Sequence, residues 1–406
     1  MTKNREEQYF VDLHVHIGRT EENLRVKVTA SRDLTFANIA QECLMRKGID
    51  IVGIVDCASP YVIRDIEKLL NSGEMRELRD GGLRYQDRVT IILGSEIETK
   101  EDNSGLSHQI AYFPYFSDIR QFSIKISKLV TNPNLSSQNS GITAQEFHDL
   151  TDSSGGIAIP AHVFTPYKSI FGSCTAHLAE IFNPLTLQKI PAIELGLSAD
   201  TYLADCLPEL NRFTFLTNSD AHSLPKIGRE YNIIRMEQPT FKELLMALKK
   251  ESGRAVIANY GLDPKLGKYH RTHCEECSYT ATAADLPPVL FCEKCGSNRI
   301  TKGVLDRIIE ISGNCESRSP SHRPPYYHQI PLEFVPSIGQ KTKETLFNQL
   351  GTEMNVLHHT DFATLSKVVG SKIAYDIILA HKGELILQSG GGGKYGKVKK
   401  DNLRKI

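Results

Sequence analysis

The residues with the clearest chemical potential are two histidines spaced by one residue near the start of the chain. His14 and His16 follow a short run of β-forming residues at positions 9–11. On a strand, residues i and i+2 point to the same face, so we expect the two imidazoles to project side by side. Two neutral imidazoles on one face form a bidentate site for a divalent metal ion. For a lone His-x-His pair, two histidines at an exposed strand end are as good an interpretation as a metal site.

Further histidines and carboxylates recur at the ends of predicted strands, and they shift the balance toward a metal site. They are Asp56, Glu96, His108, His162, Asp220 and His222. All but His108, which opens its strand, lie near the carboxyl end of an apolar run, where α/β folds place their chemistry. For each residue singly, a capping or surface role is the simpler interpretation. For the set, a metal site is favoured.

The elements that must position these side chains follow an alternating pattern. Short apolar runs with little alternation indicate strands covered on both faces, and segments of helical periodicity lie between them. This repeat predicts an α/β barrel. The expected strands are residues 10–16, 51–56, 89–96, 109–113, 156–161, 192–195, 213–217 and 254–258. The expected helices include residues 36–47, 62–70, 119–129, 144–152 and 241–249.

The set of histidines and carboxylates resembles the metal site of the polymerase-and-histidinol-phosphatase (PHP) superfamily. These proteins are metal-dependent phosphoesterases built on a distorted seven-stranded (β/α) barrel. The resemblance implies one ion held by four residues that also form the catalytic set. They are His14, His16, Glu96 and Asp220.

The resemblance also implies that Glu96 bridges to a second ion, which His108 and His162 hold as well. Closely spaced divalent ions activate a water molecule and neutralise charge on the scissile phosphate. Imidazoles and carboxylates accept several metals, so zinc, manganese and magnesium stay open, as does the choice between two and three ions.

A third ion would involve His222, and here the chain departs from the family pattern. Members with a full third site often carry Thr-Asp-His after the second strand and a further histidine in the first loop. This chain has Asp56 and Cys57 after that strand, and no histidine in residues 18–23. We expect Asp56 to replace the imidazole, and Cys57 to be an ordinary buried residue. A weak or absent third ion is the alternative.

Four of the nine cysteines form two Cys-x-x-Cys pairs that flank residues 278–291. They are Cys274, Cys277, Cys292 and Cys295. Two such pairs predict a tetrahedral four-cysteine site with one structural zinc ion, which stabilises a small segment without a core of its own. A redox dithiol is the alternative. The other cysteines are single, which indicates a reducing compartment rather than a disulfide framework.

The last third of the chain predicts paired helices with glycine turns. Gly339 and Gly370 each precede a helical pattern, as in helix–hairpin–helix motifs, where backbone N–H groups contact a DNA phosphate. A plain helical packing module is the alternative. The loop 319–328, rich in proline and tyrosine, either contacts bases or packs onto the barrel. The glycine run and lysines of residues 390–406 predict a flexible basic tail.

Composition sets outer limits on the function. The 48 basic and 48 acidic residues argue against a generic polyanion binder. The sequence contains no apolar run long enough to span a membrane and no secretory signal at its polar start, so we expect a cytoplasmic protein. The motifs divide the chain into a barrel (1–262), a zinc segment (263–302), a helical DNA-contact part (303–389) and the tail (390–406).

The order of these parts resembles the endonuclease Q family over essentially the whole chain. Local strings at residues 31–35, 162–166, 196–200, 228–230, 322–326 and 390–396 support the resemblance. It implies a DNA repair endonuclease that incises 5′ to a deaminated base (uracil, hypoxanthine or xanthine) or an abasic site. Its implied partner is DNA containing such lesions, and docking of a replication or repair clamp stays open.

A base-specific nuclease must take the damaged base out of the stack into a pocket beside the metals. We expect Phe164, Tyr167 or Phe171 to stack on the base, Ser198 to contact its edge and Arg229 to hold a phosphate. Two alternatives remain. A histidinol-phosphatase-like enzyme for small molecules would not explain the zinc segment, and a noncatalytic DNA-binding partner would not explain the retained ligands.

Overall fold

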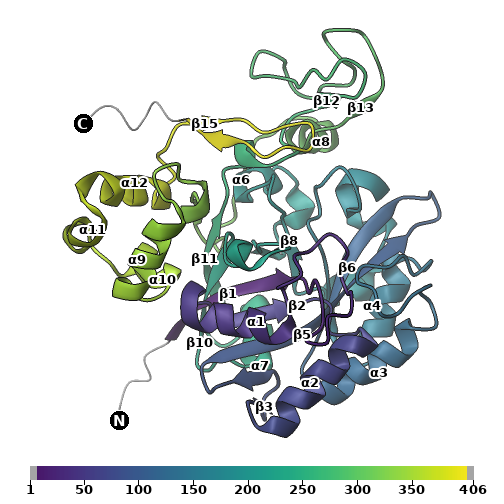
Figure 1. Cartoon of the computed structure of the whole chain (residues 1–406). Helices are drawn as coiled ribbons and strands as arrows, with labels where there is room; N and C mark the ends of the chain where they lie inside the picture. The colour runs from purple at the N-terminus through teal and green to yellow at the C-terminus, as the bar shows by residue number, and fades with distance from the viewer. Residues whose placement is uncertain (1–6, 400–406) are drawn as a thin grey trace.

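The computed structural model in Figure 1 describes residues 7–399 and has a mixed α/β fold, as predicted. The strands of the main sheet are β1 (Glu7–Val15), β2 (Ile51–Ile54), β3 (Met75–Glu77), β4 (Leu83–Tyr85), β5 (Val89–Lys100), β6 (Leu106–Phe113), β7 (Ile157–Pro160), β10 (Tyr231–Met236), β11 (Ala255–Gly261) and β14 (Tyr326–His328). A separate parallel pair consists of β8 (Ala192–Glu194) and β9 (Thr214–Leu216). The helices of this part are α1 (Phe36–Glu42), α2 (Pro60–Ser72), α3 (Phe116–Ile126), α4 (Ala144–Asp152), α5 (Pro184–Lys189), α6 (Thr201–Ala204) and α7 (Phe241–Leu248).

All of the expected strands are present, but their pairing is less regular than a parallel barrel. β1, β2 and β5 are parallel neighbours, whereas β5, β6 and β7 pair antiparallel. Only residues 101–105 connect β5 to β6, and so short a connection allows a hairpin but no crossover. The sequence prediction also missed β10, which pairs antiparallel with β1.

Strand β1 shows why the two histidines share a face. Its odd-numbered residues Val11, Leu13 and Val15 are fully buried among apolar side chains. Asp12 and His14 of the same strand, and His16 directly after it, are buried as well and face the opposite side. The apolar side chains therefore fix the strand, and the strand aims the imidazoles. Helices α2, α3 and α4 lie together on one side of the sheet (Figure 1).

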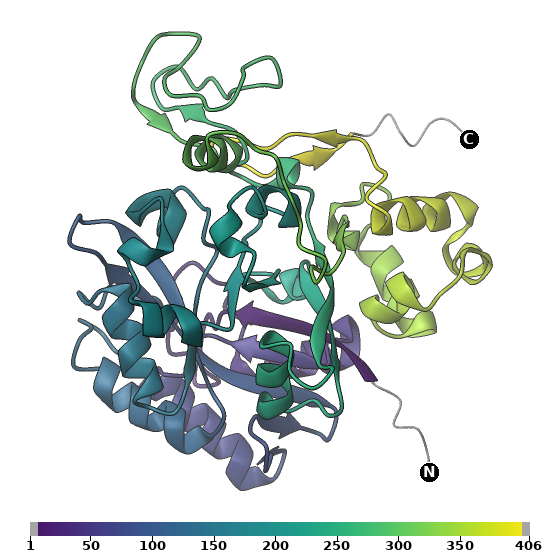
Figure 2. The same ribbon diagram turned by 180° about the vertical axis from the view of Figure 1, so that it is seen from behind.

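The zinc segment projects from the barrel, as both views show (Figures 1 and 2). It runs between the short strands β12 (His273–Cys274) and β13 (Ile300–Thr301), and α8 (Val304–Ser312) follows. Its base is held by an ion pair between Arg271 and the fully buried carboxylate of Asp306, with 3.1 Å between Arg271 Nε and Asp306 Oδ2. The segment is thus held in place by its contact with α8 rather than by a hydrophobic core of its own.

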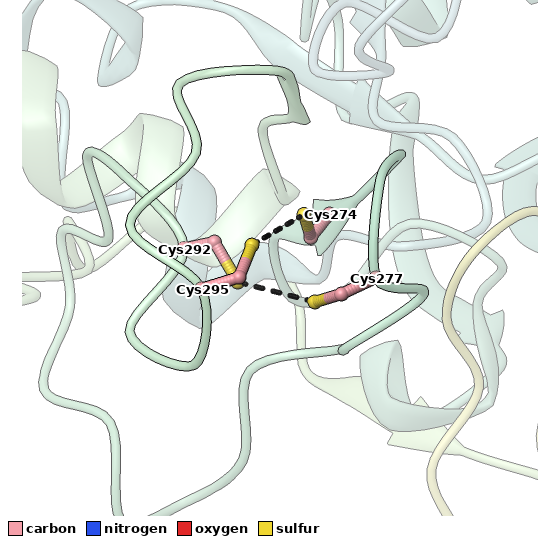
Figure 3. A group of neighbouring side chains, drawn as sticks. All are labelled: Cys274, Cys277, Cys292 and Cys295. Atoms are coloured by element: carbon pink, nitrogen blue, oxygen red, sulfur yellow. Dashed lines mark hydrogen bonds between the residues drawn. The ribbon is translucent and has the colours of Figure 1, made fainter.

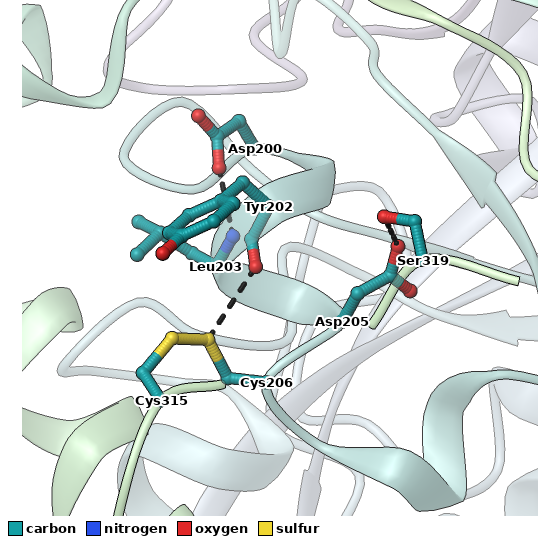
Figure 4. Close-up of a disulfide and its surroundings, with 7 residues drawn as sticks. All are labelled: Asp200, Tyr202, Leu203, Asp205, Cys206, Cys315 and Ser319. Atoms are coloured by element: carbon teal, nitrogen blue, oxygen red, sulfur yellow. Dashed lines mark hydrogen bonds between the residues drawn. A yellow bond between two sulfur atoms is a disulfide. The ribbon is translucent and has the colours of Figure 1, made fainter. Parts of the chain in front are cut away.

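The segment after α8 packs onto the barrel, as one of the two interpretations of the proline-rich loop predicted. Arg323 lies 3.4 Å above the Phe215 ring and pairs with Asp205 at 2.8 Å. Close by, Cys206 and Cys315 form a disulfide (Figure 4). We expected the cysteines outside the zinc segment to be single, and this pair shows that the expectation is wrong. The sequence does not indicate the pair, because its two residues are 109 positions apart and meet only after folding.

The C-terminal helices form a separate group beside the barrel (Figures 1 and 2). They are α9 (Gln340–Leu350), α10 (Glu353–His358), α11 (Phe362–Val369) and α12 (Ser371–His381). Gly339 and Gly370 precede α9 and α12, as the hairpin pattern predicted. A buried ion pair between Lys47 Nζ and Glu353 Oε2, 2.7 Å apart, anchors the group to the barrel.

The tail is more ordered than the sequence suggested. Strands β15 (Leu387–Gln388) and β16 (Lys397–Val398) form a hairpin that returns across the barrel toward the zinc segment (Figure 1). The expectation of a flexible tail is therefore wrong for residues 390–399, and residues 400–406 lie outside the described part. Within residues 7–399, no helix combines the length and apolar character that crossing a membrane requires.

A buried carboxyl group predicts how stability varies with pH. Glu230 is fully buried; its Oε1 accepts a hydrogen bond from the Leu262 N–H, and its Oε2 has no hydrogen-bond partner within residues 7–399. Burial raises the pKa of Glu230 from its ordinary 4.5 to about 8. Between these values the folded chain holds a proton that the unfolded chain releases, so this contribution to stability is lost as pH rises toward 8.

We therefore expect Glu230→Gln to unfold at a higher temperature than the wild-type chain, by a margin that grows between pH 5 and pH 8. The amide keeps the shape of the side chain and has no charge to bury. Thermal unfolding followed by circular dichroism measures the margin. The exposed Glu251→Gln serves as control. A constant margin across this pH range would contradict the assignment.

Candidate active site

The predicted metal ligands converge at one end of the sheet. They come from the ends of β1 and of β9, from β5 and β6, and from the turn after β7. Most of them line a cavity of about 260 Å³. Three overlapping groups of side chains could each hold a metal ion, because the ligand atoms within each group lie within 4.8 Å of one another. The groups are His14–His16–Glu96, Glu96–His108–His162 and His16–Asp220–His222.

The first group has the short distances that a shared ion needs. The Nε2 atoms of His14 and His16 are 3.3 Å apart. Glu96 Oε1 lies 3.4 Å from His14 Nε2, and Glu96 Oε2 lies 3.5 Å from His16 Nε2. Asp220 Oδ1 closes the group at 3.6 Å from His14 Nε2 and 3.5 Å from His16 Nε2. Two imidazoles and two carboxylates suit a divalent ion in this position.

The second and third groups share residues with the first. Glu96 Oε1 is 2.9 Å from His108 Nδ1 and 3.4 Å from His162 Nε2, so this carboxylate faces both the first and the second group. His222 Nδ1 lies 3.5 Å from Asp220 Oδ1. His108 Nε2 is buried and forms no hydrogen bond within 3.5 Å among the described residues, and the Glu98 carboxylate lies 3.7 Å from it. The donor set therefore fits adjacent metal positions.

Two carboxylates hold the imidazoles from behind. Glu194, at the end of β8, lies 3.0 Å from His14 Nδ1, and Asp56 lies 3.1 Å from His16 Nδ1. Each leaves the Nε2 atom free to face the metal positions, an arrangement that fixes the ring orientation of metal-bound histidines. We predicted Asp56 as a ligand, but its place behind the ring favours a positioning role. Glu194 was missed, although it is a carboxylate at a strand end.

The charges of the site stabilise one another. Burial raises the pKa of Glu96, but His108, Lys27 and His16 outweigh burial and hold it well below its usual range. Burial likewise raises the pKa of Asp220, and the surrounding histidines hold it well below normal. Both carboxylates are therefore ionised at neutral pH, as metal ligands must be.

The backbone is unusual at two of these positions. His162 and Asp220 adopt φ angles of +28° and +44°, in the left-handed region that side chains rarely occupy. Gly196 allows the first of these turns, since a Cβ at this position would lie only 2.8 Å from His162 Cβ. Such backbone conformations cluster at functional sites.

Replacing the carboxylate of Glu194 by a neutral amide tests whether this residue supports metal binding by His14. Glu194→Gln is expected to weaken divalent-metal affinity about 10- to 100-fold, because the amide no longer fixes the His14 ring as a carboxylate does. Competition with a chromophoric chelator measures the affinity. Glu101→Gln, a buried carboxylate that accepts from the Ala144 N–H instead, is the matched control. Equal affinities of the two variants would contradict the role of Glu194.

The predicted substrate contacts separate into two kinds. Ser198 and Tyr167 line the cavity, and Tyr167 is about half exposed. Phe164 and Phe171 are buried and stack on each other with ring centres 5.3 Å apart, so the prediction that either of them stacks on a base is wrong. Arg229 donates hydrogen bonds to the backbone oxygens of Ser219 and Asp220. Its guanidinium therefore supports the turn that carries Asp220.

Several residues of the cavity wall were not predicted as site residues. Among them are Lys27, Lys268, Tyr269 and Tyr395. The Tyr395 hydroxyl accepts a hydrogen bond of 3.0 Å from Arg229, and Lys268 lies 4.7 Å from its ring centre. Tyr395 comes from the C-terminal hairpin, and no local signal marks a tail residue that reaches the barrel.

The four cysteines of the zinc segment lie together, as Figure 3 shows. The sulfur atoms of Cys274 and Cys295 are 3.7 Å apart, and those of Cys277 and Cys292 are 3.5 Å apart. Sulfurs at about 2.3 Å from a tetrahedral zinc ion are about 3.8 Å apart. The spacing therefore fits the predicted four-cysteine zinc site.

Comparisons with known proteins agree with this architecture. A family model described as PHP-associated matches residues 207–252. The chain is 46% identical to the uncharacterized protein YqxK of Bacillus subtilis over 392 residues, which is 96% of this chain and 99% of that protein. It is 40% identical over 253 residues to the uncharacterized protein MJ0043 of Methanocaldococcus jannaschii, covering 58% of this chain and 31% of that protein.

Two solved structures are similar over almost the full length. The lesion-specific endonuclease PfuEndoQ of Pyrococcus furiosus has a TM-score of 0.82 and 31% identity, with 98% of each chain covered. An endonuclease Q bound to a 27-mer duplex with an abasic lesion at the active site has a TM-score of 0.81, with the same identity and coverage. With its PHP-type ligand set, its four-cysteine cluster and this full-length similarity, the chain belongs to the endonuclease Q family.

Proposed function

We propose that the protein is a metal-dependent DNA repair endonuclease that hydrolyses the phosphodiester 5′ to deaminated bases or abasic sites. The observation that carries the proposal is the overlap of three His/carboxylate groups beside a cavity, in a chain that matches a lesion-specific endonuclease over 98% of its length. Deaminated bases here are uracil, hypoxanthine and xanthine.

The roles of the side chains follow from their positions. His14, His16, Glu96 and Asp220 would hold one divalent ion, and Glu96 would share a second with His108 and His162. Bound zinc, manganese or magnesium ions supply the activation of water and the neutralisation of phosphate charge. Water activated in this way would need no protein nucleophile and no covalent intermediate.

The cavity beside the ligands suits a base that has left the stack. Tyr167 and Tyr269 provide aromatic faces on which a base stacks, and Ser198 provides a hydroxyl group for its edge. An abasic site needs no base contact, so it enters the same cavity without them. Recognition thus combines the ease of extruding a damaged nucleotide with the fit of the extruded group.

The other parts of the chain would hold the DNA around the lesion. We assign residues 1–262 to the catalytic barrel, 263–302 to the zinc segment and 303–389 to the helical part. The open glycine turns at Gly339 and Gly370, where an added Cβ would meet no atom within 4 Å, leave the starts of α9 and α12 accessible to phosphates. Docking of a replication or repair clamp is a further expectation of the family resemblance.

A nicking assay on end-labelled oligonucleotides tests the proposal. The strands carry one uracil, one hypoxanthine, one abasic site or no lesion, and the reactions contain manganese, magnesium, zinc or EDTA. A metal-dependent cut 5′ to the lesion, absent from the control strand, is the expected result. Equal cutting of undamaged DNA would leave a general nuclease. Hydrolysis of a phosphate monoester without any DNA cleavage would instead indicate a small-molecule phosphoesterase.

A further inference from the structure

Side-chain amides join β9 to the main sheet, where the backbone forms no ladder. Within the part of the chain that the structure describes, β8 and β9 pair only with each other, and no ladder links β9 to β10 or β11. Three buried asparagines bridge this gap: Asn218 after β9, Asn232 on β10 and Asn259 on β11. A buried backbone N–H or C=O without a partner is costly, so these amides substitute for the missing ladder.

The middle amide, Asn232, pairs with both backbone groups of Thr217. Its Oδ1 accepts from the Thr217 N–H at 3.0 Å, and its Nδ2 donates to the Thr217 oxygen at 2.9 Å. Asn259 Nδ2 donates to Asn232 Oδ1 at 2.9 Å and to the Phe215 oxygen at 3.0 Å. Since Thr217 holds both ends of the Asn232 amide, Asn232 keeps its orientation even without Asn259.

The amide of Asn218 points toward the metal site. Its Oδ1 accepts from the Leu13 N–H at 3.0 Å and from Asn232 Nδ2 at 3.2 Å. Because both of these donors lie on the oxygen side, the Nδ2 group points the other way, where it donates to Glu194 Oε1 at 3.1 Å. The partners of Asn218 therefore fix which end of the amide faces the carboxylate. Asn218 also lies two positions before the predicted ligand Asp220.

Glu194 is held at both of its oxygens, and its orientation decides that of His14. Oε2 accepts from the His162 N–H at 3.1 Å, while Oε1 accepts from Asn218. Held in this way, the two oxygens lie 3.0 and 3.1 Å from His14 Nδ1. Without Asn218, the carboxylate would keep only the His162 donor and would be free to turn about it. Residues that orient metal-bound histidines contribute about 10- to 100-fold to metal affinity.

We propose that Asn218 is a positioning residue of the metal centre, which acts through Glu194 on His14. The inference rests on the proposed function, because it concerns the metal site of the same reaction. Asn232 fixes the amide of Asn218, whereas Asn259 only joins β9 to β11. Loss of the Asn218 amide therefore weakens metal binding, and the same change at Asn259 lowers stability alone.

Two matched pairs of variants test the proposal. Asn218→Asp and Asn259→Asp keep the size of the amide, and Asn218→Leu and Asn259→Leu remove its hydrogen bonds without adding a charge. Both members of a pair disturb the same buried network, so thermal unfolding should show similar losses of stability.

Manganese affinity separates the two positions. It is measured by competition with a fluorescent chelator and reports on the barrel, because thiolate sites select zinc. We expect both Asn218 variants to bind manganese about 10- to 100-fold more weakly than the wild-type chain, and both Asn259 variants to bind it as the wild-type chain does. Equal affinities within each pair would overturn the inference.

A double variant shows whether Asn218 acts through Glu194. In that case Glu194→Gln combined with Asn218→Leu binds manganese no more weakly than Glu194→Gln alone, and additive losses would contradict the proposal. In lesion cleavage, excess manganese should restore the rate of Asn218→Leu and leave the KM for DNA unchanged. A raised KM with unchanged manganese affinity would instead place Asn218 in contact with DNA.

Failure of the proposed function shows differently, because then the wild-type chain itself does not cut lesion DNA. The manganese affinities are measured without DNA, so they still decide the role of Asn218. If Asn218→Leu does not fold, the comparison of Asn218→Asp with Asn259→Asp decides it.

Discussion

The Asp220→Asn variant is expected to lose about 1,000-fold or more of its lesion-cleavage rate while it unfolds at the temperature of the wild-type chain. One oxygen of Asp220 lies within 3.6 Å of the metal-facing nitrogens of both His14 and His16. The amide has the same size but lacks the negative charge that a divalent ion requires. The loss therefore concerns chemistry rather than folding.

The backbone makes asparagine a suitable substitute at this position. Residue 220 has a φ of +44°, and asparagine is one of the few residues that tolerate the left-handed region. The backbone oxygen of Asp220 accepts hydrogen bonds from His222 and Arg229, and these contacts survive the change. The exposed Asp102→Asn is the matched control. Normal turnover by Asp220→Asn would refute the metal assignment.

Removal of one cysteine from the zinc cluster is expected to have the second large effect. Cys292→Ala should lower the bound zinc by one ion per chain, because the remaining three sulfurs no longer complete a tetrahedron. Structural zinc contributes about 10–16 kcal/mol of apparent binding free energy in small zinc-finger peptides, so residues 272–302 should become sensitive to protease. The barrel has its own buried core and should remain folded.

Lesion cleavage should fall with the zinc, because the zinc segment supports the cavity wall. The Tyr167 hydroxyl hydrogen-bonds to Thr301 Oγ1 at 2.6 Å, and Tyr269 precedes the first cysteine pair. Hydrolysis of bis(p-nitrophenyl) phosphate, which needs only the metals of the barrel, should persist. Cys174→Ala, which removes a buried thiol outside the cluster, should change neither zinc content nor cleavage. Loss of both activities in Cys292→Ala would contradict a separate role for the segment.

The sequence by itself determined the parts of the protein that depend on local spacing. The i, i+2 histidines of β1 face one side because a strand alternates its side chains, and the apolar neighbours identify that strand. The paired Cys-x-x-Cys motifs predicted the sulfur cluster for the same reason, since a short spacing fixes the distance between ligands. The α/β class followed from the alternation of apolar runs and helical segments.

Only the tertiary structure decided which distant residues meet. Glu194 and Asp56 hold the metal-facing histidines because folding brings the ends of β8 and β2 to the end of β1. Phe171 turned inward and Tyr395 turned toward the cavity, and neither has a local pattern that fixes its direction. Lys27 lies in a loop without periodicity. Local geometry follows from the spacing of residues along the chain, whereas contacts between loops depend on how whole elements pack.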